Sequence, residues 1–261
     1  VALAGLAQAH EFWIDPEAFM VPEGGDLVAA IRVGQTFKGS SYSFLPPNFR
    51  RFDIVMGGAV TPVEGRAGDR PALSMAAPST GLAVVVHVTK DYSLTYKEWD
   101  KFESFAEHKD FTPLLAEHTA RGLPREGFAE LYSRHAKSLI AVGDGVGSDA
   151  EMGLLTEIVA LENPYTDDMS DGFDVQVFYQ GAARGDVQVE LFARAPSGDI
   201  TVTRHRTDAQ GVARLPVEPG AVYLADHVVM RAMEPVAEGD PVWESLWASL
   251  TFAVPAGAGT E

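Results

Sequence analysis

The sequence predicts a mainly β protein made of two immunoglobulin-like, antiparallel β-sandwich units, with a helical insertion in the first unit. Two observations predict this class. Short apolar runs of strand length recur along the chain, and clusters of Gly, Pro and Asp separate them. Such an alternation of short strands and turns is typical of antiparallel sandwiches. With 261 residues, the chain is long enough to bury one large core or two smaller ones.

The predicted strands share β-type patterning and are bounded by turn residues. They cover residues 27–33, 51–56, 82–89, 138–142, 157–161, 174–179, 187–193, 200–204, 212–215, 222–230 and 247–254. A polar, turn-rich segment at 163–172 divides this series. We therefore expect an N-terminal unit over residues 10–165, a C-terminal unit over 173–254 and a polar tail at 255–261.

One region, at about 96–137, has helical rather than strand spacing. Its apolar residues recur in three groups: Tyr96, Trp99 and Phe102; Phe111, Leu114, Leu115 and His118; and Phe128, Leu131, Tyr132 and His135. Gly122 followed by Pro124 is a typical end for the middle helix. We therefore predict that a helical insertion interrupts the first sandwich.

Composition excludes several classes of function. The formal net charge is −17, which repels phosphate backbones, so we expect no nucleic-acid partner. No apolar run approaches the ~20 residues that a membrane-spanning helix needs. The chain has no cysteine, which excludes thiolate chemistry and leaves His, Asp and Glu as metal ligands.

The first nine residues predict an export signal. Val1–Ala9 is small and apolar, and Ala7-Gln8-Ala9 satisfies the A-x-A rule for cleavage by a signal peptidase. Cleavage would fall directly before His10, so we expect residues 1–9 to be the remnant of a signal peptide and the protein to be periplasmic. The alternative is an ordinary Ala-rich N-terminus.

His10 is the first candidate metal ligand. After cleavage, its α-amino nitrogen and its ring nitrogen would form a chelating pair, which one further imidazole could complete. A nitrogen-rich site of this kind favours Cu(II) and then Ni(II). In the alternative interpretation, His10 only caps the first strand and binds no metal.

Four other histidines could supply the further imidazole. His227 and His87 lie on predicted strands, whereas His118 and His135 each close an apolar helical stripe and would lie side by side if the two helices formed a hairpin. The alternative for each is a core histidine whose ring nitrogens bind carbonyl groups.

Several motifs resemble one known family. They are the segment His10-Glu11-Phe12-Trp13-Ile14-Asp15-Pro16 after the A-x-A site, the runs at 132–140 and 157–165, the Thr207-Asp208-x-x-Gly211 turn and the terminal run at 247–252. Together they resemble the DUF4198 family, whose members are often described as periplasmic components of nickel or cobalt uptake systems. The resemblance implies an exported, two-part β protein with a nickel, cobalt or copper role. Only His10 is a ligand candidate that matches a family motif.

These features lead to a ranked set of functional expectations. The first is an exported periplasmic protein that binds Ni, Co or Cu as an accessory to metal uptake, passing the ion to a membrane transport component or another envelope protein. The alternative is a non-metal envelope adaptor built from two β-sandwiches. A His10 copper enzyme comes last, and we expect no enzyme, because no general acid or base is identifiable.

Overall fold

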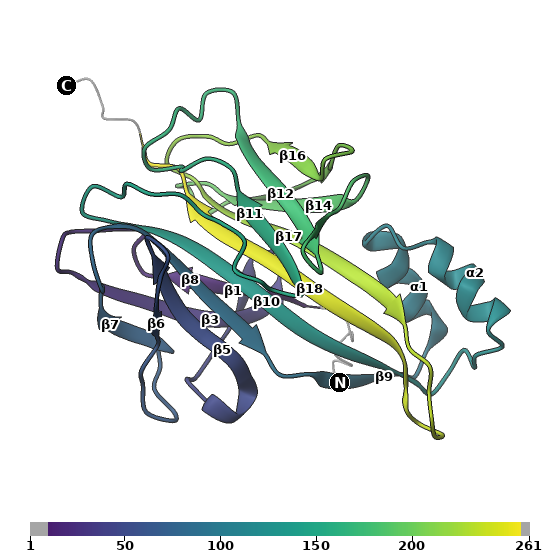
Figure 1. The fold of residues 1–261 in the computed structure, drawn as a ribbon. Helices are drawn as coiled ribbons and strands as arrows, with labels where there is room; N and C mark the ends of the chain where they lie inside the picture. Colours follow the sequence, from purple (N-terminus) through teal and green to yellow (C-terminus); the bar gives the residue numbers. More distant parts are fainter. Residues whose placement is uncertain (1–9, 257–261) are drawn as a thin grey trace.

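The computed structural model describes residues 10–256, so the predicted signal remnant at 1–9 and most of the tail lie outside the described residues. The chain is mainly β, which confirms the predicted fold class. Figure 1 shows one long sheet with a smaller sheet on each face and two helices at one end. In the described part of the chain, no helix combines the length and apolarity needed to cross a bilayer.

The long central sheet contains ten strands. They are β2 (Met20–Val21), β5 (Phe49–Met56), β6 (Ala59–Pro62), β8 (Gly81–Thr89), β9 (Tyr92–Tyr96), β10 (Phe128–Val142), β14 (Gln188–Arg194), β15 (Ile200–Arg206), β17 (Val222–Ala232) and β18 (Pro241–Ala253). The order is β15-β14-β17-β18-β10-β8-β5-β6, with β2 and β9 also pairing with β10. The strands predicted at residues 51–56, 82–89 and 138–142 all lie in this sheet.

Two four-stranded sheets flank the central one. The first sheet comprises β1 (Glu11–Pro16), β3 (Asp26–Gln35), β4 (Lys38–Tyr42) and β7 (Leu73–Ala76). The other comprises β11 (Thr156–Ala160), β12 (Phe173–Tyr179), β13 (Ala182–Ala183) and β16 (Val212–Leu215). A 3₁₀ turn, η1 (Pro46–Asn48), precedes β5.

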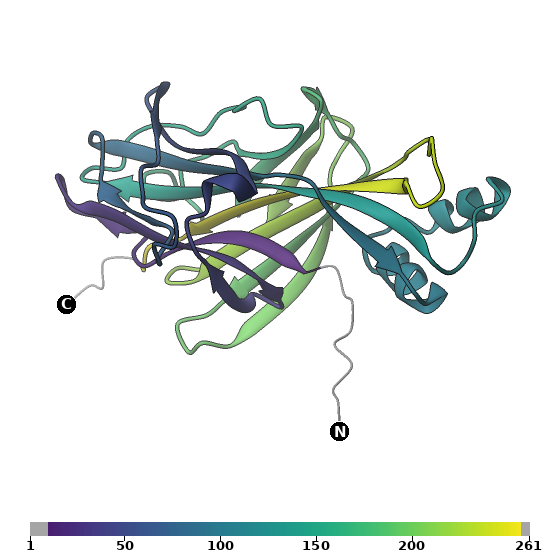
Figure 2. The ribbon, with the colours of Figure 1, turned by 90° about the horizontal axis from the view of Figure 1, so that it is seen from below.

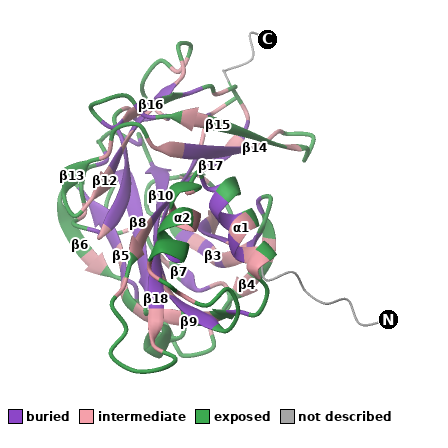
Figure 3. Cartoon of the chain, turned by 90° about the vertical axis from the view of Figure 1, so that its right-hand side faces the viewer, coloured by how far each residue is buried: buried purple, intermediate pink, exposed green. Residues whose placement is uncertain are grey.

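The period of two along β8 explains the three layers. Val84 and Val86 belong to the core shared with β11 and β12, whereas Ala83 and Val85 belong to the core shared with β1 and β3. Since successive side chains of a strand point to opposite faces, central strands such as β8 are buried on both sides, whereas the edge strands β15 and β6 are largely exposed. This double burial is visible as the continuous purple of the central strands in Figure 3.

Strands from both predicted units share this central sheet. β10 and β18 pair in parallel, from Glu130 opposite Trp243 to Ser138 opposite Thr251. The expected turn-rich segment does lie between β11 and β12, but both of these strands belong to the same flanking sheet. The two halves of the chain are therefore joined by backbone hydrogen bonds rather than only by a linker.

The helical insertion is shorter than predicted. The helices are α1 (Trp99–His108) and α2 (Pro113–Ala120), and Figure 2 shows them beyond one end of the long sheet. The prediction of helix over residues 128–137 is wrong, because this segment belongs to β10. In the first half of β10, polar residues such as Glu130 and Ser133 occupy buried positions, so the apolar residues follow no period of two and mimic a helical stripe.

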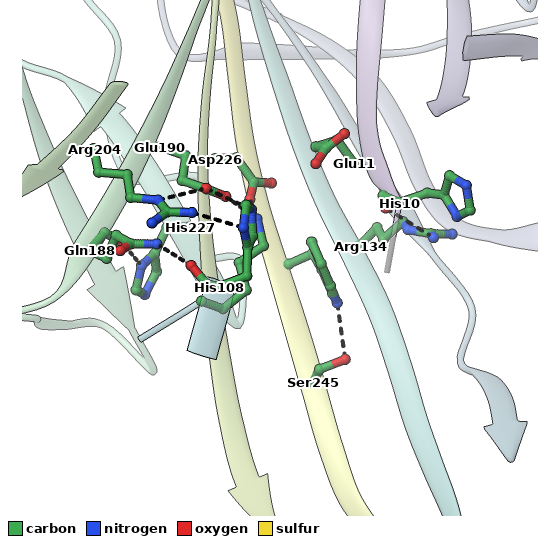
Figure 4. A network of polar contacts seen from close by, with 12 residues as sticks. His10, Glu11, His108, Arg134, Gln188, Glu190, Arg204, Asp226, His227 and Ser245 are labelled. Atoms are coloured by element: carbon green, nitrogen blue, oxygen red, sulfur yellow. Dashed lines mark hydrogen bonds and ion pairs between the residues drawn. The ribbon is translucent and has the colours of Figure 1, made fainter. Parts of the chain in front are cut away.

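Helix α1 is anchored to the sheet by a buried ion cluster. Lys109, directly after α1, bonds to Glu190 of β14 and donates to the Asp226 carboxylate of β17 at 2.8 Å. All three side chains are at most 4% exposed. His108 lies 2.9 Å from the second Glu190 oxygen, in the network drawn in Figure 4. The ammonium group of Lys109 is thus the shared counter-charge of two carboxylates that the fold withdraws from water.

A second buried acid lies beneath the same helices. Glu130 of β10 accepts hydrogen bonds from the Tyr96 hydroxyl, at 2.8 Å, and from the Ser245 hydroxyl, which in turn accepts from the Trp247 indole. Burial is the main cause that raises the pKa of Glu130 to about 7. The ionised form of Glu130 is therefore disfavoured in the folded protein.

Replacing Lys109 should destabilise the fold strongly. In Lys109→Met, Glu190 and Asp226 lose their buried counter-charge, so we expect the free energy of unfolding at pH 7 to fall by about 3–5 kcal/mol. Urea denaturation measures this change. Lys97→Met is the matched control, because Lys97 is exposed, and it should change stability by less than about 0.5 kcal/mol. Equal effects of the two substitutions would contradict the anchoring role.

Glu130 should make stability depend on pH. Because its pKa is about 7 in the folded state and near 4.5 when exposed, its stabilising contribution is complete below pH 4.5 and is lost as pH rises through 7. Relative to Glu130→Gln, the wild type should lose roughly 2–3 kcal/mol of unfolding free energy between pH 5 and pH 8. Denaturation curves of both proteins across this range give the difference. Parallel pH profiles would show that Glu130 ionises freely.

Candidate functional site

A groove of about 210 Å³ opens beside the first strand. Its walls come from β1, β3, β4, β5, β8, β9 and β10, so rigid sheet elements position most of its lining. The lining residues are Phe12, Ile31, Val33, Tyr42, Ser43, Leu45, Asn48, Phe49, His87, Thr89, Tyr92, Tyr132 and Arg134. Five of these thirteen residues are Phe or Tyr, and Arg134 brings the only formal positive charge among them.

Arg134 lies between aromatic rings in the groove. Its guanidinium carbon is 4.8 Å from the Tyr132 ring centroid and 5.7 Å from that of Phe12. One Nη donates to the His10 carbonyl at 3.3 Å, as Figure 4 shows, while the buried Nε has no hydrogen-bond partner. Within residues 10–256, no ion pair joins Arg134 to a carboxylate. Burial lowers the pKa of this guanidinium, which nevertheless stays protonated.

His87 forms another part of the groove wall. The register of β5 and β8 places it opposite Phe52, and its ring centroid lies 5.0–5.3 Å from those of Phe52, Phe12 and Phe49. Burial lowers its pKa to about 3, so the imidazole is neutral at pH 7. Its Nδ1 is buried and has no hydrogen-bond partner.

His10 precedes β1 and is partly exposed. By strand alternation it lies on the same side of this segment as Phe12, which contacts both Arg134 and His87. The neighbouring Glu11 points to the other side, where its carboxylate accepts from the Thr36 backbone N–H at 3.1 Å. Burial, together with the charge of Asp226, raises the pKa of Glu11 to about 7.

His118 and His227 have both ring nitrogens occupied by internal partners. The indole of Trp243 donates to Nδ1 of His118 at 3.0 Å, and Nε2 of His118 lies 2.9 Å from the Pro124 carbonyl. His227 contacts the Gln188 carbonyl through Nδ1 at 2.7 Å and Arg184 through Nε2 at 3.1 Å. These contacts match the core-histidine alternative and leave no lone pair directed at an open site.

His135 lies elsewhere than predicted. It is on strand β10 rather than on a helix, so the expected hairpin that would bring His118 and His135 together does not form. Its Nδ1 is 3.3 Å from the Trp247 carbonyl, and burial lowers its pKa to about 4. His135 lines a separate pocket with Arg50 and Glu244, on the face of β10 opposite Arg134.

The five predicted ligands therefore do not form one cluster. Across residues 10–256, no three His, Asp or Glu side chains converge as a group able to hold a metal ion. Of the candidates, only His10 and His87 adjoin the same feature, the groove. The sequence did not predict Arg134 as a site residue, because residues 128–137 were expected to be helical. The spacing of its neighbours Tyr132 and His135 does not indicate a strand.

Comparisons with known proteins place the chain in a family without assigning it an activity. No curated protein sequence matches it. One solved structure, described as "Crystal structure of tetra-tandem repeat in extending region of large adhesion protein", is similar with 12% identity and a TM-score of 0.19. That match covers 93% of this chain and 49% of the other, so this chain spans about half of its length. Similarity at this level supports no structural or functional argument.

The family comparison covers most of the sequence. The family described as "Domain of unknown function (DUF4198)" matches residues 7–231, which include the groove, the two helices and the His10-Glu11-Phe12-Trp13 segment. Because the match extends over far more than half of the chain, this protein belongs to the DUF4198 family.

Proposed function

We propose that this chain is a non-catalytic binding protein of the bacterial periplasm, with the groove beside β1 as its ligand site. The single observation that carries the proposal is a half-buried arginine, Arg134, that lines an aromatic groove and has no carboxylate partner within residues 10–256. A charge withdrawn from water is normally paired, so an unpaired one in a groove favours a ligand that supplies the pairing group.

The construction of the groove supports a binding role. Ligand sites are usually concave, mostly apolar and lined by a few polar groups that fix orientation, and this groove combines aromatic walls with Arg134 and His87. Its walls are strands, which hold side chains more precisely than loops do. The location in the periplasm rests on the A-x-A sequence before His10.

Binding of fragments should locate this function in the groove. We expect ligand-observed NMR with a library of neutral and charged ring compounds to find binders, and Tyr132→Ala to weaken them by at least tenfold, because Tyr132 forms part of the wall. Tyr179→Ala is the control, since Tyr179 lies on β12 outside the groove. Binders that are insensitive to Tyr132→Ala, or a library without binders, would contradict the proposal.

A transition-metal role is the second candidate, and one observation favours it. His87 is a neutral imidazole, as a metal ligand must be, its buried Nδ1 has no hydrogen-bond partner, and it contacts Phe12, two residues after His10. In this candidate the α-amino and ring nitrogens of His10 would hold Ni, Co or Cu with His87 as a third donor, and the protein would hand the ion to an envelope transport component. The α-amino nitrogen becomes a ligand only after cleavage behind Ala9.

Calorimetry separates the two candidates. If His10 binds metal, protein that begins at His10 should bind Cu(II) or Ni(II) with a micromolar or lower Kd, and His10→Ala or His87→Ala should weaken binding by at least tenfold. His205→Ala is the control, because His205 lies on β15. Mass spectrometry of the exported protein checks its first residue. The groove proposal instead expects weak metal binding that is equal in all four proteins.

A further inference from the structure

We propose that Arg134 makes the groove a receptor for a small aromatic monocarboxylate. This inference rests on the proposed function, since it names the ligand class of the same groove. The ligand carboxylate would pair with the Arg134 guanidinium, and its ring would lie between the aromatic side chains of the walls.

The first argument is the missing counter-charge. Three nearby arginines have an acidic partner: Arg32 pairs with Asp15, Arg50 with Asp91 and Arg51 with Asp53, each at 2.6 Å. Arg70 has none within residues 10–256, but it is exposed and donates to the Ser43 hydroxyl at the groove. Arg134 is half-buried, yet no carboxylate among residues 10–256 pairs with it. This absence is unexpected in a chain of net charge −17, which has many carboxylates to offer. A buried charge is costly unless it is paired, so an anion from outside would relieve that cost.

The second argument is the geometry of the donors. A guanidinium group is planar and can present two parallel N–H donors to one carboxylate. In Arg134, Nε is enclosed by protein, so a ligand carboxylate would pair with the Nη edge, where one Nη makes only a long, 3.3 Å contact with the His10 carbonyl. The ring centroids of Tyr132 and Phe12 lie 4.8 and 5.7 Å from the guanidinium carbon and restrict its movement. Arg134 is therefore already oriented, and binding would order few additional side-chain torsions.

The third argument is the shape and polarity of the remaining groove. Phe12, Phe49, Tyr92 and Tyr132 give it aromatic walls, and Tyr42, which is 50% exposed, lies at its open side. An apolar cavity of about 150 Å³ holds benzene. A groove of about 210 Å³ therefore has room for one ring with a short carboxylate arm. The single cation and the acidic chain favour a monoanion over a phosphate dianion.

The test compares matched acids and amides on the full chain. Benzoate and phenylacetate are the probes, benzamide and phenylacetamide are their neutral counterparts, and calorimetry or NMR titration measures Kd. We expect each acid to bind at least about tenfold more tightly than its amide, because the amide carries no charge and offers one acceptor oxygen instead of two. Arg134→Gln should weaken the acids by at least about tenfold and leave the amides within about threefold.

Arg50→Gln is the control for loss of one positive charge, since Arg50 is exposed and paired with Asp91, and it should leave both acids unchanged. If Arg134→Gln does not fold by circular dichroism, the preference of the wild type for acid over amide still decides the question. Amides that bind as tightly as acids would overturn the carboxylate inference but leave the groove as the binding site. If no ring compound binds at all, both proposals fail.

Discussion

The parallel pairing of β10 with β18 is the constraint on which the rest of the structure depends. It joins residues 113 apart in sequence, such as His135 and Ala248, and makes one central sheet from both halves of the chain. β10 also pairs with β2, β8 and β9, so it borders both the groove and the helical end. Any ligand that contacts Arg134 therefore contacts the strand that connects every layer of the molecule.

Alternation along β10 determines which residue can serve as a site. Arg134 points to the layer of β1 and reaches the His10 carbonyl, whereas His135 points to the opposite face and the Trp247 carbonyl. A shift of register by one residue would exchange the two side chains. The pairing of Arg134 opposite Trp247 fixes this register, so the sheet hydrogen bonds decide that a guanidinium, and not an imidazole, faces the groove.

The strands and the mainly β class could be predicted because turn residues and apolar runs are local signals. The helix at 128–137 could not be rejected from sequence, because polar residues such as Glu130 and Ser133 occupy buried positions of β10, which removes the alternation that identifies a strand. For the same reason, the placement of His135 was wrong and Arg134 was missed. His118 and His227 were recognisable as histidines of the core, but their partners, Trp243 and Gln188, are distant in sequence. Unpartnered atoms such as Nδ1 of His87 become visible only in three dimensions.

The charge beside His10 bears on which ligand the groove favours. A cation held by His10 would lie near Arg134, because one Nη of Arg134 is 3.3 Å from the His10 carbonyl oxygen. Within residues 10–256, no carboxylate pairs with the charge of Arg134. Glu11 could compensate only in part, because its pKa of about 7 leaves it substantially protonated near neutral pH and its side chain is directed to Thr36. Because His10 is partly exposed, water screens much of the repulsion between a divalent ion and the guanidinium, but the unpaired positive charge of Arg134 still favours an anion over a cation in the groove.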